Sequence, residues 1–515
     1  MHNSETYFYN PVSNKEASVN VWMAFPGPES FAMSSLGYLW LFKNIDEIQD
    51  VNVERIYSDS KTTTLKKEDI DLIGFSFTFD TDFINIFSML DKYKIPLRSN
   101  NRGSDLPFIF AGGPVVTANP TPYEAFFDFF VIGDGEKLNL DIINLYKDNT
   151  DISKEEFLNK LAKLDGIYVP NISKTVKKNT EKLSDCIYTP IISEKAFFPN
   201  TFIMEAARGC ANRCGFCIAS YLNLPLRCIP YEKILEVIDL GLSKTNKIAL
   251  LGAQLSAHPK FNDICKYILE KIQNGMEIEM SVSSLRVDSI TSDIMRTLVA
   301  CGQKNVTLAV EAGSERLRKV INKNLTKQQI LNAVKIAKEA GLKGFKFYGM
   351  LGLPTETKED IDEMILLAKE LKSAYKGFDI SFGFSTFVPK PNTPFQWIGR
   401  EDNKSLEQKS NYIKKEMHKI GVHATVSSAK WDYWQAVLSR GDSRLADLLE
   451  EVYKTGGKLG AYKKAAVKFN IDTDEIAHGN WSFDSQLPWD FIELNPGKEF
   501  LIKENQRLLN DNHLL

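Results

Sequence analysis

The sequence TFIMEAARGCANRCGFC, residues 201–217, joins a predicted β-strand to a loop that carries three cysteines. The first seven residues are mostly apolar, which is typical of a buried strand. Cys210, Cys214 and Cys217 then follow in a C-x3-C-x2-C spacing. Three thiolates on one short loop can hold a metal centre from one side. The stretch therefore predicts a metal site at the end of a strand.

Two kinds of metal centre fit this loop. A zinc ion needs a fourth Cys or His, and the next candidate is Cys228, eleven residues after Cys217. A [4Fe–4S] cluster held by three cysteines leaves one iron open for a substrate or cofactor. The other cysteines are scattered, so we expect inert thiols there. They are Cys186, Cys228, Cys265 and Cys301.

Outward from the loop, strand-like and helix-like segments alternate toward the C-terminus. Six βα units in sequence predict a parallel barrel, whole or partial, with its chemistry at the carboxyl ends of the strands. The cysteine loop follows the first of these strands. Predicted strands cover 201–207, 247–252, 277–284, 305–313, 344–352 and 379–388, and predicted helices include 231–242, 326–340 and 358–371.

The N-terminal part has a second α/β pattern, over residues 18–150. It predicts a doubly wound sheet, and its glycine pairs in AGGP (111–114) and GDGE (133–136) fall at strand ends, where such sheets bind ligands. Strands are predicted at 19–26, 52–58, 71–78, 106–113 and 127–136. Residues 151–200 are expected to be a connector with a polar, mobile part, and 401–515 a mostly helical region.

The composition is that of a globular chain of about three domains. Of 515 residues, 63 are Lys or Arg and 66 are Asp or Glu, a formal net charge of −3. This balance gives no strong nucleic-acid signature. No apolar run approaches the ~18 residues of a membrane span. The N-terminus lacks a secretory pattern and the cysteines are sparse, so we expect a cytoplasmic protein and no membrane partner.

The cysteine loop, with Phe216 before its last Cys, resembles the signature of the radical S-adenosylmethionine (radical SAM) enzymes. Residues 18–150 resemble the cobalamin-binding-type domain that precedes many of their barrels. FVPKPNTPFQW (387–397) and LPWDFIE (487–493) resemble a subfamily with such a B12-type domain. The resemblance implies an α/β fold: an N-terminal Rossmann-like sheet, a partial (β/α)6 barrel over 201–400, and a mostly helical C-terminal region.

The resemblance also implies the cofactors. Cys210, Cys214 and Cys217 would ligate a [4Fe–4S] cluster, and its open iron would bind SAM. Reductive cleavage would then give a 5′-deoxyadenosyl radical, with an electron donor such as flavodoxin or ferredoxin. Gly252–Gln254 is GAQ, where the family commonly has Gly-Gly-Glu. The expected SAM-binding residues are Phe216, Gly252, Ala253, Gln254, Ser283, Arg286, Glu311, Gly349 and Gly352.

Three functions follow from this resemblance. The first is a cobalamin-dependent methyltransferase, with cobalamin between the N-terminal sheet and the barrel mouth. The second is a cobalamin-independent radical SAM enzyme that rearranges, couples or thiolates its substrate, RNA included. The third is a non-catalytic iron–sulfur module.

The absence of His and Cys from parts of the sequence bears on the choice among these three functions. No His lies between His2 and His258, so the D-x-H-x-x-G loop that ligates cobalt is absent, and cobalamin binding stays open. No Cys precedes Cys186, which disfavours the methylthiotransferases with a second three-cysteine cluster. Neither the substrate nor any further catalytic residue is indicated.

Overall fold

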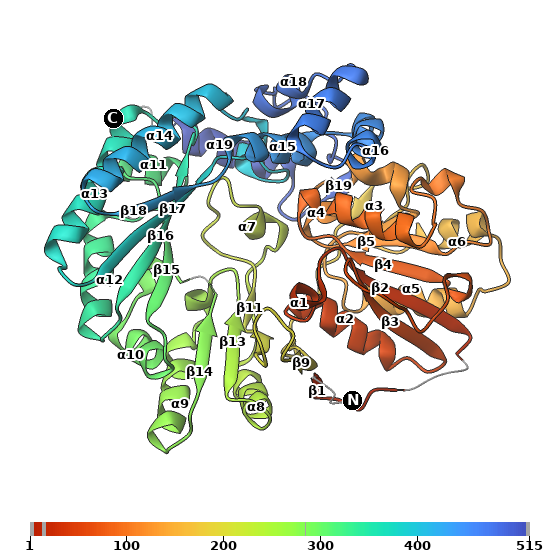
Figure 1. Ribbon diagram of the computed structural model, residues 1–515, viewed down its shortest axis with the longest axis horizontal. Coiled ribbons are helices and arrows are strands. Elements are labelled where there is room, and N and C mark those ends of the chain that lie inside the picture. Colours follow the sequence, from red (N-terminus) through yellow and green to blue (C-terminus); the bar gives the residue numbers. More distant parts are fainter. Residues whose placement is uncertain (1–4, 13–16, 284, 511–515) are drawn as a thin grey trace.

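The computed structural model describes residues 5–12, 17–283 and 285–510. An N-terminal lobe and a curved layer of parallel strands lie side by side, and the C-terminal helices run over one end of both (Figure 1). Ser284, the last residue of the predicted strand 277–284, lies outside the described residues.

The N-terminal lobe is built on a six-stranded sheet in the order β3-β2-β4-β5-β6-β7. The first five strands are parallel, and β7 is antiparallel to β6. Because β3 and β4 flank β2 on opposite sides, the chain reverses direction there, and ligands bind at such a point outside the carboxyl ends of the strands. The strands are β2 (Val19–Phe25), β3 (Val51–Tyr57), β4 (Leu72–Ser76), β5 (Phe108–Gly112), β6 (Phe129–Val131) and β7 (Ile167–Tyr168).

Two apolar cores cover the faces of this sheet. One face packs against α2 (Leu36–Asp46), α5 (Leu138–Lys147) and α6 (Lys154–Leu161). The other packs against α3 (Phe83–Lys92) and the C-terminal helices α15 (Ala429–Arg440), α16 (Ala446–Lys454) and α17 (Leu459–Lys468). The C-terminal helices therefore complete the core of the N-terminal lobe.

The second lobe is a curved layer of seven parallel strands. Three form one sheet and four another, and a bridge between Leu285 and Leu308 joins them. The strands are β10 (Phe202–Glu205), β13 (Lys247–Leu251), β14 (Glu279–Val282), β15 (Asn305–Glu311), β16 (Gly344–Leu351), β17 (Asp379–Thr386) and β18 (His423–Val426). Strand β18 falls in the region for which the sequence predicts helices.

Amphipathic helices cover the outer side of these strands with one continuous core. They are α8 (Tyr231–Leu242), α9 (Phe261–Gln273), α10 (Ser292–Ala300), α12 (Lys327–Glu339), α13 (Lys358–Ala374) and α14 (Asn403–Lys419). Thr326 caps the N-terminus of helix α12, and its side chain forms a reciprocal cap with Gln329. The α/β fold class and the alternation expected from the sequence are confirmed.

The connector differs from the expectation that its polar part is mobile. Val176 and Lys178 are buried, and β8 (Val176–Lys177) pairs with β19 (Ile492–Glu493) near the C-terminus. Asn179 donates its backbone N–H to Ile132 O at 2.9 Å. Lysine-rich composition predicted a solvated segment, but backbone pairing and burial of the aliphatic stems hold it in place. No helix among the described residues is long and apolar enough to cross a membrane.

Candidate functional site

The cysteine loop lies between the two lobes. It follows β11 (Ala207–Arg208), and Cys217 begins α7 (Ile218–Leu222) as its N-cap residue. The Cys210 thiol donates to Gln254 Oε1 at 3.3 Å, and Asn212 donates to Cys210 Sγ at 3.4 Å. Cys214 is buried, whereas Cys210 and Cys217 are partly exposed.

The loop is held from outside by elements that follow much later in the chain. Gly215 donates its N–H to Ile321 O at 3.0 Å and accepts from Phe395 N at 3.1 Å. A Cβ at Gly215 would lie 2.6 Å from the Phe395 ring and 2.9 Å from Leu508, so only glycine fits under this cover. Leu508 belongs to α19 (Lys498–Asn510). Phe395, Leu508 and the side chain of Phe216 share one apolar cluster.

The charges around the thiols suit an iron–sulfur centre. Burial raises the pKa of Cys214 to about 12, and the charges of Cys217 and Glu311 act in the same direction. The nearby charges of Lys323 and Arg286 lower it. Thiolates are the ligand form, and cations beside them favour it. No three Cys, His, Asp or Glu side chains in the described residues are already gathered as a metal site, so ligation by Cys210, Cys214 and Cys217 stays a prediction.

Several predicted SAM-binding residues meet beside the loop. Ser283 accepts from Gly252 N at 3.1 Å and donates to Gly252 O at 2.7 Å, which ties the ends of β13 and β14 together. Arg286 donates to Lys323 O at 2.8 Å. Lys323 in turn pairs with Glu311 at 3.2 Å, and both side chains are largely buried.

Glu311 has an unusual backbone. Its φ is +64° at the carboxyl end of β15, where the register with β16 shifts. A non-glycine residue rarely adopts this conformation, and such strain concentrates at functional sites. With this backbone conformation, the Glu311 carboxylate pairs with Lys323.

Gly349 and Gly352 lie in a different setting. A Cβ at Gly349 would lie 2.5 Å from the Phe384 ring, on the helix-facing side of β16. Gly352 has a φ of +74°, and a Cβ there would lie 2.6 Å from Leu406 on α14. Close packing explains both glycines, and their contact with SAM stays a prediction.

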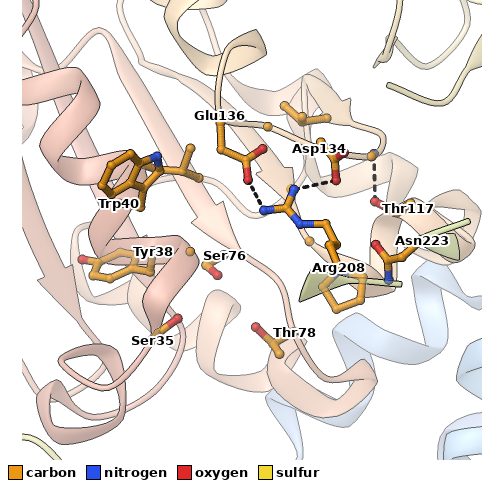
Figure 2. A pocket seen from close by; sticks show the side chains of 18 of the residues that line it. Ser35, Tyr38, Trp40, Ser76, Thr78, Thr117, Asp134, Glu136, Arg208 and Asn223 are labelled. Atoms are coloured by element: carbon orange, nitrogen blue, oxygen red, sulfur yellow. Dashed lines mark hydrogen bonds and ion pairs between the residues drawn. The ribbon is translucent and has the colours of Figure 1, made fainter. Parts of the chain in front are cut away.

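A cavity of about 610 Å³ separates the carboxyl ends of the N-terminal strands from the barrel mouth. Its N-terminal wall includes the glycines of both predicted ligand turns and the aromatic side chains of Tyr38 and Trp40 from α2 (Figure 2). Its barrel wall includes Gly252, Ala253 and Ser283. The cavity thus joins the two predicted binding regions.

Ion pairs tie the two walls together. Arg208, two residues before Cys210, pairs with Asp134 at 2.9 Å and with Glu136 (Figure 2). It also pairs with Glu205 at 2.7 Å. Arg227 also pairs with Asp134. Burial raises the pKa of Asp134, but the charges of Arg208 and Arg227 outweigh it and hold this pKa below its usual value. The GDGE turn therefore anchors the segment that leads into the cysteine loop.

Comparisons with known families and proteins agree with this arrangement. Residues 37–170 match the family described as "Radical SAM proteins, N-terminal", and residues 204–368 match the "Radical SAM superfamily". The Methanocaldococcus jannaschii protein MJ0966 is 30% identical over 454 residues, which are 86% of this chain and 94% of that protein. The chain belongs to the radical SAM superfamily. Membership identifies it as an enzyme of [4Fe–4S] and SAM chemistry.

Other relatives differ in their named activities. A Pyrococcus horikoshii protein named as a methyltransferase is 25% identical over 70% of this chain and 76% of its own length. A tRNA methylthiotransferase, the 2-methylthio-N(6)-dimethylallyladenosine synthase of Hydrogenobaculum, is 28% identical over 44% of this chain and 51% of its own length. This second likeness covers less than half of the radical SAM protein described here.

Solved structures share the fold. The radical SAM methyltransferase TsrM from Kitasatospora setae, with cobalamin and a [4Fe–4S] cluster bound, is 13% identical with a TM-score of 0.52, over 71% of this chain and 72% of TsrM. The cobalamin-dependent enzyme OxsB, with aqua-cobalamin and SAM bound, is 15% identical with a TM-score of 0.53, over 96% of this chain and 80% of OxsB. At these identities the likeness shows the fold alone.

Sequence reasoning missed the residues that join the lobes. The sequence predicts Asp134 and Glu136 only as part of a ligand turn, and it predicts no role for Arg208, their partner on the barrel side. The available signal was its position directly before the cysteine motif. Asn322 was also missed: it donates to Asn212 O at 2.8 Å and Arg213 O at 3.0 Å, which fixes the loop between two ligand candidates.

Proposed function

We propose that this radical SAM enzyme binds cobalamin in the cavity between its lobes and transfers a methyl group to its substrate. The observation that carries the proposal is the position of that cavity. One wall is the carboxyl end of a doubly wound sheet, and the other contains Gly252, Ala253 and Ser283, three of the predicted SAM-binding residues. A cobalamin and a SAM bound on these walls would be neighbours.

The cluster and SAM belong to the barrel side of this site. Cys210, Cys214 and Cys217 hold the [4Fe–4S] cluster, and Gln254 and Asn212 orient the first of these thiols. The hydroxyl of Ser283 and the guanidinium of Arg286 suit the ribose and the carboxylate of SAM. The proposed division is an N-terminal domain over 18–150, a connector over 151–200, a barrel over 201–400 and a C-terminal region over 401–515.

The cavity wall fits cobalamin in two respects. Gly37 on α2 lines the cavity and has open space where a Cβ would stand, so the helix leaves room for a broad flat ligand. Glu136 Oε2 is buried without a hydrogen-bond partner among the described residues, and it can accept from an amide of the ligand's rim. Bound there, cobalamin would supply the methyl group, and the cluster would supply the electron that cleaves SAM.

The residues of this chain bind the cofactors and exclude water from the space between them. Tyr38, Trp40 and Phe75 give the N-terminal wall an apolar lining, which strengthens polar contacts in the interior. Arg208 fixes the distance between the walls through Asp134 and Glu136. No histidine is among the described residues of the lining, so the lower face of cobalamin would have no imidazole ligand.

That last observation supports a second candidate, a radical SAM enzyme without cobalamin. In it the N-terminal lobe would serve as a substrate platform, and the cavity would hold substrate. The two candidates differ in whether cobalt is retained in the cavity.

A cavity-filling variant tests the choice. We expect Gly37→Trp to lose cobalt but keep iron after anaerobic reconstitution with iron, sulfide and hydroxocobalamin. Gly37 lines the cavity with open space at its Cβ position, so the indole would occupy part of the space that cobalamin needs. Gly460→Trp is the matched control, since Gly460 also lies in a helix with open space beside it, in α17, outside the cavity lining. Equal cobalt in both variants, or none in the unaltered protein, would contradict the cobalamin proposal.

A further inference from the structure

Strand β16 turns two large side chains into the inside of the barrel. Its residues alternate between buried and open positions. Phe345, Phe347 and Leu351 face the outer helices and belong to the barrel's core. Lys346 and Tyr348 lie on the opposite face and are exposed, Tyr348 with 46% of its surface.

The neighbours of these two residues are small or hydroxylated. Tyr348 lies in register with Ala309 on β15 and Gly383 on β17. Lys346 lies in register with Thr307 and Ser381. Gly383 makes room for the pair, because a Cβ there would lie 3.2 Å from the Tyr348 ring and 3.3 Å from the Lys346 side chain.

This inner face differs from that of a complete barrel. In a closed (β/α)8 barrel the inward side chains fill the interior in layers, so a tyrosine in the middle of a strand is buried. Here the Tyr348 ring is about half exposed, because its neighbours in register, Ala309 and Gly383, are small. The inner face of β15–β17 therefore bounds an open space, with one aromatic ring and one ammonium group directed into it.

Neither side chain is engaged elsewhere. Lys346 Nζ lies 5.2 Å from the centroid of the Tyr348 ring, a cation–π contact. No hydrogen bond or ion pair joins either side chain to another described residue. Two further charged side chains lie on this face. Glu311 is already paired with Lys323, and the exposed Asp379 begins β17, in register with Gly344 and two residues before Ser381.

We propose that Lys346 and Tyr348 bind the substrate, and that the substrate carries a planar ring and an anionic group, a carboxylate or a phosphate. The ring lies against Tyr348 and the anion lies beside the Lys346 ammonium. The inference deepens the proposed function, since it rests on the radical SAM reaction at the cysteine loop, but it does not require cobalamin.

The same face leads to the reacting centre. Met350, two residues beyond Tyr348 on the same side of β16, packs with Phe216 of the cysteine loop against one apolar cluster. A substrate held by its acid at Lys346 and by its ring at Tyr348 therefore extends along β16 toward the cluster loop. Lys346 and Tyr348 thereby select the substrate and fix its orientation.

Acetylation of Lys346 measures this binding without a known substrate. The reconstituted protein is treated with an acetylating ester, and the rate at Lys346 is followed by peptide mass spectrometry. Lys369, exposed on the outer helix α13, is the internal control. The probes are 3-phenylpropionate and uridine 5′-monophosphate, with 3-phenylpropanamide and uridine as neutral partners and 3-cyclohexylpropionate as the non-planar one.

We expect at least one acidic ring probe at ~10 mM to slow acetylation of Lys346 about threefold, as binding with a Kd of about 5 mM would. Acetylation of Lys369 should be unaffected. The neutral compounds and the non-planar acid should protect Lys346 from acetylation less than the acidic ring probes do. Tyr348→Leu should abolish the protection and Tyr348→Phe should keep it. Protection by the phenyl acid alone indicates a carboxylate substrate, and protection by the nucleotide alone indicates a phosphate.

The proposal is overturned if no probe protects Lys346, if the neutral partners protect as well as the acids, or if Tyr348→Leu changes nothing. The acetylation experiments are run on protein reconstituted with and without hydroxocobalamin, which distinguishes a failure of this inference from a failure of the cobalamin proposal. Protection that persists in protein without cobalt supports this inference even if the methyltransferase proposal fails.

Discussion

Cys214 shows at the residue scale how distant parts of the chain converge on the proposed cluster. Its thiol is buried, and the nearby cations come from separate segments: Arg286 follows β14, and Lys323 lies between β15 and α12. We predict that Cys214→Ala lowers bound iron from about four per chain to background and stops SAM cleavage. Cys301→Ala removes an equally buried thiol from the barrel core and should leave both intact. Iron analysis and 5′-deoxyadenosine formation provide the measurement, and iron retained by Cys214→Ala would refute the ligand assignment.

A second prediction at the residue scale concerns Arg208 and the pH dependence of stability. The pKa of Asp134 is lowered, so its contribution to stability is complete above about pH 4 and is lost as the pH falls through the folded-state pKa. Arg208→Met leaves buried carboxylates short of a partner and should destabilise the apoprotein by about 3 kcal/mol at pH 7. The deficit should shrink toward pH 4, as these carboxylates take up protons.

The control for this effect is Arg444→Met. Arg444 pairs with Asp442 but is largely exposed, so its loss should change stability by well under about 1 kcal/mol. Urea unfolding at several pH values gives the comparison. An Arg208→Met deficit that is small or does not depend on pH would contradict the role assigned to the ion-pair cluster.

At the scale of elements, FVPKPNTPFQW (387–397) covers the cysteine loop. Phe395 from this segment is fully buried and lies on Gly215. We predict that Phe395→Ala costs about 4 kcal/mol and also speeds the loss of iron to a chelator, because the loop loses its outer support. Phe87→Ala removes an equally buried ring from the N-terminal lobe and should cost as much without affecting iron release. Equal iron release from both variants would show that Phe395 does not support the loop.

The sequence predicted most elements because their local patterns agree with their packing. Helix α8 has the predicted bounds Tyr231–Leu242, and the strands of both lobes lie where apolar runs indicate them. Strand β18 was missed because it is only four residues long, and its apolar face consists of Ala424 and Val426 alone. Pairing with β17 holds it in the sheet. The connector was mistaken for a mobile segment because lysine content says nothing about backbone pairing with residues three hundred positions away.

At the scale of the whole molecule, the site exists only where the two lobes meet. The cysteine spacing predicts an iron–sulfur site, and the strand-end glycines predict ligand-binding turns. Neither pattern indicates how far apart the cluster site and the turns lie in the fold. That distance is fixed by Arg208 with Asp134 and Glu136, and by C-terminal helices that pack on the N-terminal lobe. Such long-range contacts leave no periodic signal in the sequence. The glycine turns and Gly252, Ala253 and Ser283 of the cavity lining could therefore be predicted, but the ion pairs that join its walls could not.

The most direct test of the shared cavity is anomalous diffraction from anaerobic crystals of the reconstituted protein, recorded at the iron and cobalt absorption edges. We predict an iron peak beside Cys210, Cys214 and Cys217 and a separate cobalt peak in the cavity between Gly113 and Gly252. Iron at the cysteines with no cobalt peak in the cavity, or cobalt bound elsewhere, would contradict the account.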